Sequence, residues 1–320
     1  MKIDKSAIIL IADHHGLLGR AIRAQLENAG CRNVYDDASS LTDSNAIDKV
    51  FASAAPEWVF LVGGRTGGIS ANQRFPADLM LDNLLLECHV MSNALSHNAR
   101  KLLYLASSCA YPKFCEQPMR VDALMSGKLE PTNIAYATAK LAGLQLCQAI
   151  RRQYRRDFIV AIPANSYGPG DDFSEEDAHV VGALMRRMHQ AKVANEPEVL
   201  VWGSGTPRRE FIYSNDLARA CLFLMEHYQG DEPINVGVGR DWSIRELAEI
   251  IKGVVGYCGD LRFDGDQPDG MPAKLLDSRQ LLDLGWCPET SLEDGLRETY
   301  QWYLRQQRDD AARQSDRAIL

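Results

Sequence analysis

Several features are absent from this 320-residue sequence, and each absence argues against a class of protein. No run of about 18 uninterrupted apolar residues occurs, so we predict a soluble chain with no membrane partner. The eight cysteines include no Cys-x-x-Cys pair, which argues against a zinc site or a disulfide framework and predicts reduced thiols and no metal. No small-residue cleavage site follows the short apolar stretch from Ala7 to Ala12, so we expect a cytoplasmic location.

Basic residues are also fewer than acidic residues. Lys and Arg number 35 against 43 Asp and Glu, which leaves a formal net charge of -8 and predicts no nucleic-acid partner. The one basic cluster, Arg151, Arg152, Arg155 and Arg156, is interpreted as a solvated helix end. Hydrophobic residues make up 46% of the chain, enough for a sizeable core, and the length suggests two lobes.

The first half of the chain alternates short apolar runs with longer helical patterns, which is typical of a parallel sheet wound with crossover helices. We predict strands over Ile8–Ala12, Asn33–Tyr35, Trp58–Val62, Leu102–Ala106 and Phe158–Ala164. Helical spacing predicts helices over Leu17–Ala29, Ala77–His97 and Ala135–Tyr154. The predicted fold class is α/β: a doubly wound parallel (Rossmann) sheet that forms a dinucleotide-binding domain over residues 1–164.

After Ala164 the regular alternation stops, and we predict a second, smaller α+β substrate-binding lobe over residues 165–320. Segments near 211–237 should return to the first domain, with a strand at Ile234–Gly237. Predicted elements of the second lobe include a helix over His179–Ala194, a capping box at Ser243–Glu246 before another helix, and a last helix over Leu292–Leu304. The charged tail from Arg305 is expected to be frayed or disordered.

The segment after the first predicted strand runs Asp13-His14-His15-Gly16-Leu17-Leu18-Gly19. A dinucleotide-binding chain places its glycine-rich turn here: Gly16 would let the backbone approach a pyrophosphate, and Gly19 would let the helix pack on the strand. Two glycines three apart before a helix also arise by chance, and Asp13 stands where the first glycine of the turn belongs.

A second motif combines Ser107, at the end of the fourth predicted strand, with Tyr136 and Lys140 on a helix. Residues four apart share a helix face, so the Lys140 ammonium should lie near the Tyr136 phenol and lower its pKa. Tyr136 could then exchange a proton while Ser107 hydrogen-bonds the same carbonyl oxygen. The alternative is an ordinary surface pair of tyrosine and lysine.

The stretches Leu105–Lys113, Leu129–Asn133, Tyr136–Lys140 and Val201–Phe211 closely resemble the GDP-L-fucose synthase family of extended short-chain dehydrogenases/reductases. The resemblance extends to the motifs Gly67–Ile69, Pro268–Gly270 and Lys274–Asp277 and covers nearly the whole chain up to about Gln306.

This resemblance implies an enzyme of nucleotide-sugar metabolism that is both oxidoreductase and isomerase. It would invert C3 and C5 of GDP-4-keto-6-deoxy-D-mannose and reduce C4 with NADP(H). Inversion beside a ketone needs an acid and a base, and Cys109 and His179 match that pair. Their alternatives are a small buried cysteine and a histidine that merely starts a helix.

The family resemblance also implies the binding residues. For the GDP-sugar they are Asn165, Arg187, Val201, Trp202, Arg209 and Lys274. For the dinucleotide they are Asp13, His15, Gly16, Leu17, Leu18, Gly19, Asp36, Ser107, Tyr136, Lys140, Pro163, Asn165 and His179. Arginine and lysine suit a diphosphate and Trp202 offers a flat apolar wall, although Arg187 and Arg209 could instead form structural salt bridges.

Three positions depart from the family pattern. The family has glycine where this chain has Asp13, and arginines that meet the 2′-phosphate where it has His15 and Asp36. Asp36 instead resembles the acidic residue that accepts hydrogen bonds from the ribose of NAD. We therefore predict weak dinucleotide binding with the preference for NADPH relaxed or reversed toward NADH.

Two other hypotheses remain open at this level. One keeps a reductase or epimerase but changes the substrate to another GDP-linked keto-deoxysugar or heptose. The other is a catalytically weakened sugar-nucleotide-binding protein, supported by Asp13. The family resemblance also implies a homodimer formed through the long helices of the first domain.

Overall fold

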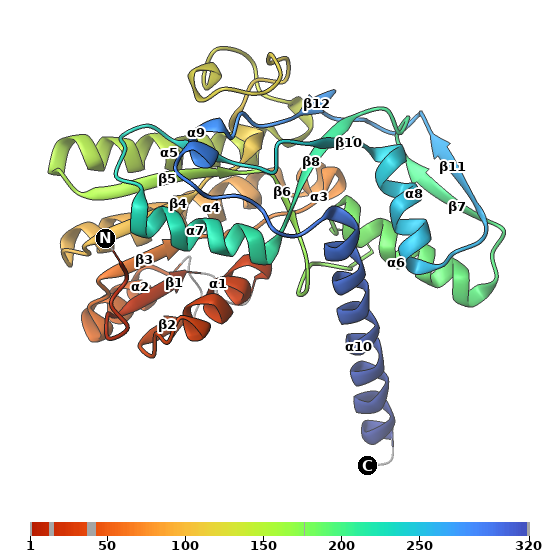
Figure 1. The fold of residues 1–320 in the computed structure, drawn as a ribbon, viewed down its shortest axis with the longest axis horizontal. Coiled ribbons are helices and arrows are strands. Elements are labelled where there is room, and N and C mark those ends of the chain that lie inside the picture. The colour runs from red at the N-terminus through yellow and green to blue at the C-terminus, as the bar shows by residue number, and fades with distance from the viewer. Residues whose placement is uncertain (1, 13–15, 37–42, 176, 319–320) are drawn as a thin grey trace.

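The structure, a computed structural model, describes residues 2–12, 16–36, 43–175 and 177–318. It contains a larger α/β part and a smaller mixed part, which share one chain that passes between them more than once (Figure 1). Within the described residues, no helix is long and apolar enough to cross a membrane.

The larger part is built on a six-stranded parallel sheet in the order β2-β1-β3-β4-β5-β9. Its strands are β1 (Ile9–Ala12), β2 (Val34–Asp36), β3 (Trp58–Leu61), β4 (Lys101–Leu105), β5 (Asp157–Pro163) and β9 (Ile234–Val236). The central strands are buried throughout, as expected for a sheet covered on both faces. The predicted strands and the returning strand are confirmed to within about a residue at most ends.

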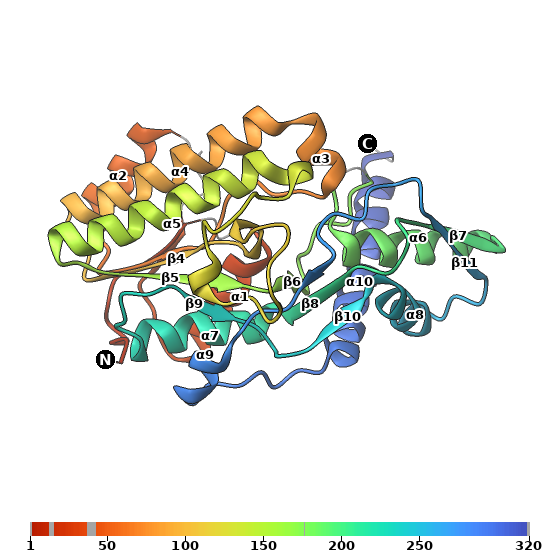
Figure 2. The ribbon, with the colours of Figure 1, turned by 90° about the horizontal axis from the view of Figure 1, so that it is seen from above.

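Helices cover both faces of this sheet (Figure 2). On one face lie α2 (Ser44–Ala54), α3 (Ile69–Arg74), α4 (Pro76–Ser96) and α5 (Ile134–Tyr154). On the other lie α1 (Leu17–Asn28) and α7 (Ser214–His227), which pack against each other, and α9 (Arg279–Asp283) lies beside β9. The doubly wound parallel sheet predicted from the sequence is therefore confirmed.

The smaller part has its own sheets and its own core. It contains β6 (Asn165–Tyr167), β7 (Glu198–Trp202), β8 (Arg208–Tyr213), β10 (Asp241–Ser243), β11 (Asp260–Asp264) and β12 (Ala273–Lys274), with α6 (Val180–Ala194), α8 (Ile244–Val255) and α10 (Leu292–Ala318). One sheet runs β10-β8-β12, with β6 also on β8, and β11 pairs with β7. The apolar faces of α6, α8 and α10 form a cluster separate from the core of the larger part. The division of the chain at residue 164 stays a prediction.

The last helix differs from the prediction. Instead of stopping near Leu304, α10 continues to Ala318 and extends away from the rest of the molecule (Figure 1). The expectation of a disordered tail from Arg305 is therefore wrong as far as Ala318. Alanine, arginine and glutamine in this stretch have good helix propensity, and a helix needs no hydrophobic face to continue one that is already nucleated.

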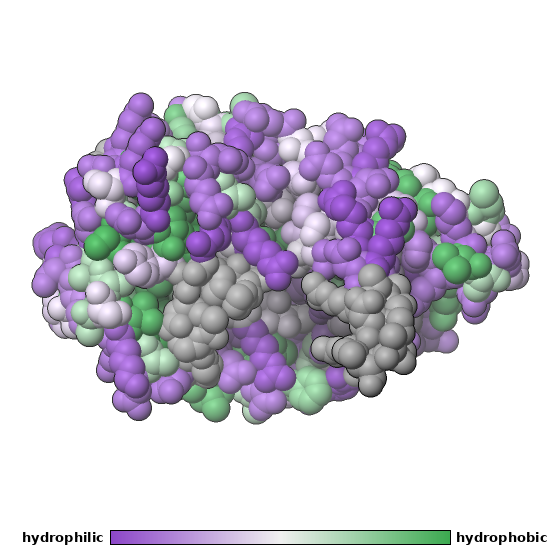
Figure 3. Space-filling model, turned by 90° about the horizontal axis from the view of Figure 1, so that it is seen from below, coloured by the Kyte–Doolittle hydropathy of each residue, from purple (hydrophilic) through white to green (hydrophobic). Residues whose placement is uncertain are grey.

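Three 3₁₀ segments lie between β4 and α5: η1 (Ser108–Ala110), η2 (Val121–Ala123) and η3 (Pro131–Asn133). They carry the chain over the carboxyl ends of the parallel strands, where ligands of such sheets bind. Seen from below, the surface is dominated by hydrophilic side chains, with hydrophobic ones in small separate groups (Figure 3).

Candidate active site

The first part of the site is the start of α1, at the carboxyl end of β1. Gly16 is the N-cap in an extended conformation, and no described side chain caps the helix. The amides of the first turn, from Leu17 to Gly19, therefore lack a helical partner and can bind a diphosphate. Leu18 and Gly19 are buried against the sheet, as helix packing requires. This arrangement fits a dinucleotide. Asp13 and His15 lie outside the described residues.

Ser107 follows β4, at the same edge of the sheet. It is the N-cap of η1, and its Oγ accepts a hydrogen bond from the Cys109 amide at 3.2 Å. Ser107 also lies within hydrogen-bonding reach of Tyr136, whose phenolate it favours. The sheet and α5 thus bring together the serine and tyrosine that are 29 positions apart in the sequence, as predicted.

Tyr136 and Lys140 lie on the same side of α5, with the Lys140 Nζ 5.9 Å from the centroid of the Tyr136 ring. The expected lowering of the tyrosine pKa is nevertheless wrong. Burial raises the pKa of Tyr136, the charges of Cys109 and Glu87 raise it further, and the hydrogen bond with Ser107 only partly opposes them. The lysine charge is instead balanced by Glu87, whose Oε1 lies 3.1 Å from the Lys140 Nζ.

Glu87 was not predicted, and it forms a buried network beneath the helix that carries Tyr136. Its side chain on α4 is almost fully buried, and the Tyr104 hydroxyl donates to its Oε1 at 2.7 Å. Lys140 also donates to the carbonyl of Gly63 at 3.3 Å. The absence of a side chain at Gly143 makes room, because a Cβ there would lie 2.3 Å from Glu87 Oε2.

This ion pair leads to a stability prediction. In Lys140→Met, the Glu87 carboxylate loses its cation while remaining buried, so we expect the free energy of unfolding to fall by about 3–5 kcal/mol. Adding Glu87→Gln should restore much of the loss, because a neutral amide costs less to bury. Urea unfolding of both variants measures this, with the exposed Lys128→Met as control. Equal stability of Lys140→Met and the control would contradict it.

Cys109 lies in η1 and receives two hydrogen bonds on its sulfur. Lys274 Nζ from β12 and Asn133 Nδ2 from η3 each lie 3.1 Å from its Sγ. Burial raises the pKa of the Cys109 thiol, but the Lys274 charge, the hydrogen bonds from Ser107 and Lys274, and the Arg209 charge outweigh it. The net pKa is lowered, which suits a cysteine that acts as a base.

His179 is the N-cap residue of α6, in the smaller part, and is exposed. Partial desolvation lowers its pKa and the Lys274 charge lowers it further, whereas Asp172 opposes both. Because Lys274 acts on His179 and on Cys109 alike, these two predicted residues face the same charged group.

The predicted GDP-sugar residues fall into two linked groups. The Arg187 guanidinium lies 5.0 Å above the ring of the half-exposed Trp202, while Lys274 and Arg209 are register partners on β12 and β8. Asp269 joins the groups: its carbonyl accepts from Arg209 at 3.2 Å and its carboxylate accepts from the amide of Ser204, two residues after Trp202.

Four other predicted binding residues lie on strands of the two parts. Asn165, at the start of β6, donates to the carbonyl of Glu210 at 2.9 Å, and Pro163 ends β5. Val201 is fully buried in the core of the smaller part, so its side chain supports the strand that carries Trp202 and offers no surface to a ligand. Asp36 ends β2, where it pairs in register with Ile11 of β1.

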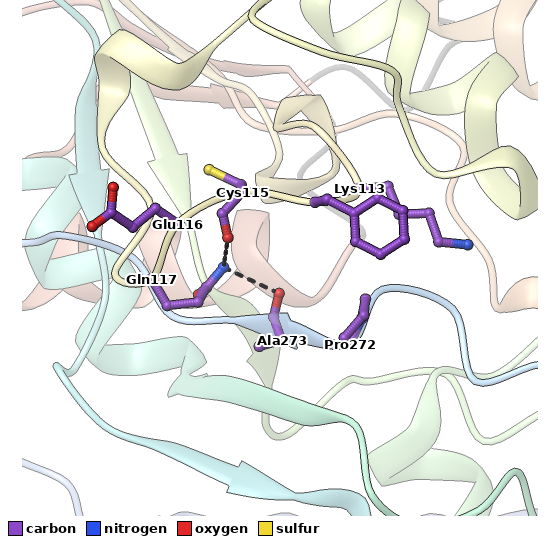
Figure 4. Close-up of a pocket in the computed structure, with 7 residues that line it drawn as sticks. Lys113, Cys115, Glu116, Gln117, Pro272 and Ala273 are labelled. Atoms are coloured by element: carbon purple, nitrogen blue, oxygen red, sulfur yellow. Dashed lines mark hydrogen bonds between the residues drawn. The ribbon is translucent and has the colours of Figure 1, made fainter.

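A pocket of about 340 Å³ opens beside this region (Figure 4). Gln117 crosses it and donates to the carbonyls of Cys115 at 3.0 Å and Ala273 at 3.5 Å. None of the predicted catalytic residues lines it, so we place the chemistry at Ser107, Cys109 and Tyr136 rather than in this pocket. Its lining residues are Lys113, Phe114, Cys115, Glu116, Gln117, Pro272 and Ala273. No group of metal-binding side chains occurs among the described residues.

Comparison with known proteins agrees with this geometry. Residues 9–237 match the model of the NAD dependent epimerase/dehydratase family. The chain is 48% identical over 305 residues to the putative GDP-L-fucose synthase 2 of Arabidopsis thaliana, covering 94% of this chain and 93% of that protein.

Solved structures are similar as well. A GDP-6-OMe-4-keto-L-xylo-heptose reductase from C. jejuni superposes with a TM-score of 0.91 at 30% identity, covering 96% of this chain and 100% of that one. A GDP-L-fucose synthetase from Naegleria fowleri bound to NADP gives 0.86 at 28% identity, covering 95% of each chain. The chain therefore belongs to the NAD dependent epimerase/dehydratase family and, within it, to the family of GDP-L-fucose synthases.

Proposed function

We propose that this protein converts GDP-4-keto-6-deoxy-D-mannose to GDP-L-fucose by inverting C3 and C5 and then reducing the C4 ketone. The observation that carries the proposal is the position of Cys109, two residues beyond Ser107 at the end of β4, with Lys274 and Asn133 donating to its sulfur. A base of lowered pKa thus stands beside the serine and tyrosine that would hold a carbonyl oxygen.

In this mechanism Ser107 and Tyr136 donate hydrogen bonds to the C4 oxygen in both stages. During inversion the oxygen carries enolate charge, and during reduction it carries alkoxide charge, so the same two donors serve twice. Cys109 and His179 exchange protons with C3 and C5. When bound, NADPH supplies the hydride for C4, and Tyr136 supplies the proton for the C4 oxygen.

The test is an assay with GDP-4-keto-6-deoxy-D-mannose and NADPH, with GDP-L-fucose as the expected product. The second candidate is a C4 reductase of a GDP-linked keto-heptose, favoured by the similarity to the C. jejuni reductase. Turnover of a GDP-keto-heptose with no turnover of the deoxymannose derivative would replace the first function by the second. Binding of GDP with no binding of either nicotinamide nucleotide would instead favour the sugar-nucleotide-binding hypothesis.

NADP(H) is the cofactor that the relatives support, and its selectivity over NAD(H) stays a prediction. The unchanged protein should bind weakly, with little preference for NADPH. Asp36→Arg should tighten NADPH about tenfold relative to NADH, because an arginine can pair with the 2′-phosphate and the carboxylate cannot. Asp13→Gly should tighten both. Calorimetric Kd values measure this, and tight, strongly NADPH-selective binding by the unchanged protein would contradict it.

We also propose a homodimer and a cytoplasmic location. A homodimer would use α4 and α5, which pack side by side on one face of the large sheet, with the exposed Leu81 and Ile134 on them (Figure 2). A cytoplasmic location follows from the expected reduced thiols, and the structure describes all eight cysteines as free.

A further inference from the structure

We infer that Lys274 is the positioning residue that holds Cys109 as a thiolate, rather than a ligand of the GDP diphosphate as its motif suggests. The inference rests on the proposed function and deepens it, since it explains how a cysteine acts as a base near neutral pH. The Lys274 ammonium and the Cys109 sulfur are 3.1 Å apart.

The geometry matches a thiolate. Lys274 and Asn133 both donate to the Cys109 Sγ, each at 3.1 Å, so the sulfur accepts two hydrogen bonds. A neutral thiol is a weak acceptor, whereas a thiolate is a strong one. The Lys274 side chain is only 7% exposed, so its charge is directed to protein groups and not to solvent.

The chain is anchored directly after Lys274. The Leu275 amide donates to the Gln117 side chain at 2.7 Å, and the Leu276 amide donates to the Glu210 carboxylate at 2.8 Å. The Leu275 carbonyl accepts from the Met119 amide at 2.7 Å. The backbone at Lys274 is therefore held by several hydrogen bonds, and its Nζ donates to the Cys109 Sγ in the absence of substrate.

The charged and titratable groups that face Cys109 favour the same conclusion. Lys274 on β12 and Arg209 on β8 are cationic and lie side by side in register. Tyr136 on α5 also faces the sulfur, and burial raises its pKa, so it is neutral at pH 7. Three acids act on these neighbours: Glu87 pairs with Lys140, Glu130 pairs with Lys113, and the Asp269 carboxylate accepts a hydrogen bond from the Ser204 amide. Lys274 and Arg209 thus both lower the pKa of the Cys109 thiol, from two adjacent strands.

The resulting step balances without any further reagent. The thiolate takes a proton from a carbon beside the ketone and becomes a thiol, while the C–H electron pair moves into the enolate. Ser107 and Tyr136 hold the enolate oxygen, and His179 gives a proton to the carbon from the opposite face. Lys274 stays protonated throughout and transfers nothing.

The test measures the titration of Cys109 directly, by alkylating the full-length protein with iodoacetamide across pH and quantifying each cysteine by mass spectrometry. In Lys274→Met, the rate for Cys109 at pH 7 should fall at least about tenfold, which corresponds to one unit of pKa. Lys274→Arg should retain most of the rate, because a cation remains. The exposed Cys258 and Cys287 are internal controls and should not change.

An unchanged alkylation profile of Cys109 in Lys274→Met would overturn the inference. Reaction of the buried Cys147 and Cys221 would show that Lys274→Met unfolds. In that case Lys274→Gln, which keeps a hydrogen-bond donor without charge, replaces it, and the same fall in the alkylation rate of Cys109 is expected. The pKa of His179, followed by NMR, should rise in either variant, since removing a nearby cation favours protonation. Alkylation needs no substrate, so its result does not depend on whether the proposed function is correct.

Discussion

Tyr136→Phe is expected to lower the rate of C4 reduction by about 10²–10⁴-fold while leaving the Kd for GDP nearly unchanged. The substitution removes the one hydroxyl that delivers a proton to the C4 oxygen. It removes little contact surface, because the ring stays in place beside Lys140. The effect should therefore appear in kcat and not in nucleotide binding.

Single-turnover oxidation of NADPH, followed by absorbance, measures the reduction, and calorimetry with GDP measures the binding. Tyr154→Phe is the matched control, since Tyr154 is the exposed last residue of the same helix and should tolerate the change. Near-normal turnover by Tyr136→Phe would remove Tyr136 from the mechanism, whatever its geometry.

The second large effect concerns the epimerase stage. Cys109→Ser and His179→Gln should each slow proton exchange at C3 or C5 by about 10²–10⁴-fold, because each removes one acid-base group. A serine hydroxyl has a far higher pKa than a thiol, so Lys274 cannot convert it to a base. Hydride transfer to the unepimerised ketone should persist in both variants, since Ser107 and Tyr136 remain.

Mass spectrometry of product formed in deuterated water measures this exchange, and NADPH oxidation in the same tube measures hydride transfer. Cys287→Ser, at an exposed cysteine, is the control for the chemical change alone. Unaltered solvent exchange in both Cys109→Ser and His179→Gln would mean that the inversion uses other groups or does not occur.

Much of the larger part of the fold could be predicted, because its strands are short apolar runs and its helices have clear spacing. The capping box at Ser243 and Glu246 is present with both of its hydrogen bonds. The strands of the smaller part were harder to predict from the sequence. Strands such as β8 (Arg208–Tyr213) and β12 (Ala273–Lys274) are short and carry charged residues, and they pair with each other although the partners are 65 positions apart in the sequence. No local pattern signals such a pairing.

Some residues of the candidate site could likewise be identified from the sequence, and others could not. Ser107, Tyr136 and Lys140 were identified by their residue types and spacing, whereas Cys109 and His179 were implied by the family resemblance. Glu87 stands in no motif, because its role comes from its contact with Lys140 on another helix. Asp269 lies in the motif Pro268–Gly270, but its contact with Arg209 appears only in the fold. The expected direction of the Tyr136 pKa was wrong because burial, which only the fold shows, raises this pKa most. The i, i+4 spacing does place Lys140 nearby, but Glu87 balances the lysine charge.

The most direct test of the central claim is one reaction in deuterated water with GDP-4-keto-6-deoxy-D-mannose and unlabelled NADPH. The account predicts GDP-L-fucose that carries deuterium at C3 and C5 and protium at C4, because Cys109 and His179 exchange protons with solvent while the C4 hydrogen comes from the cofactor. A reduced product that retains protium at both C3 and C5 would contradict it and leave a simple C4 reductase.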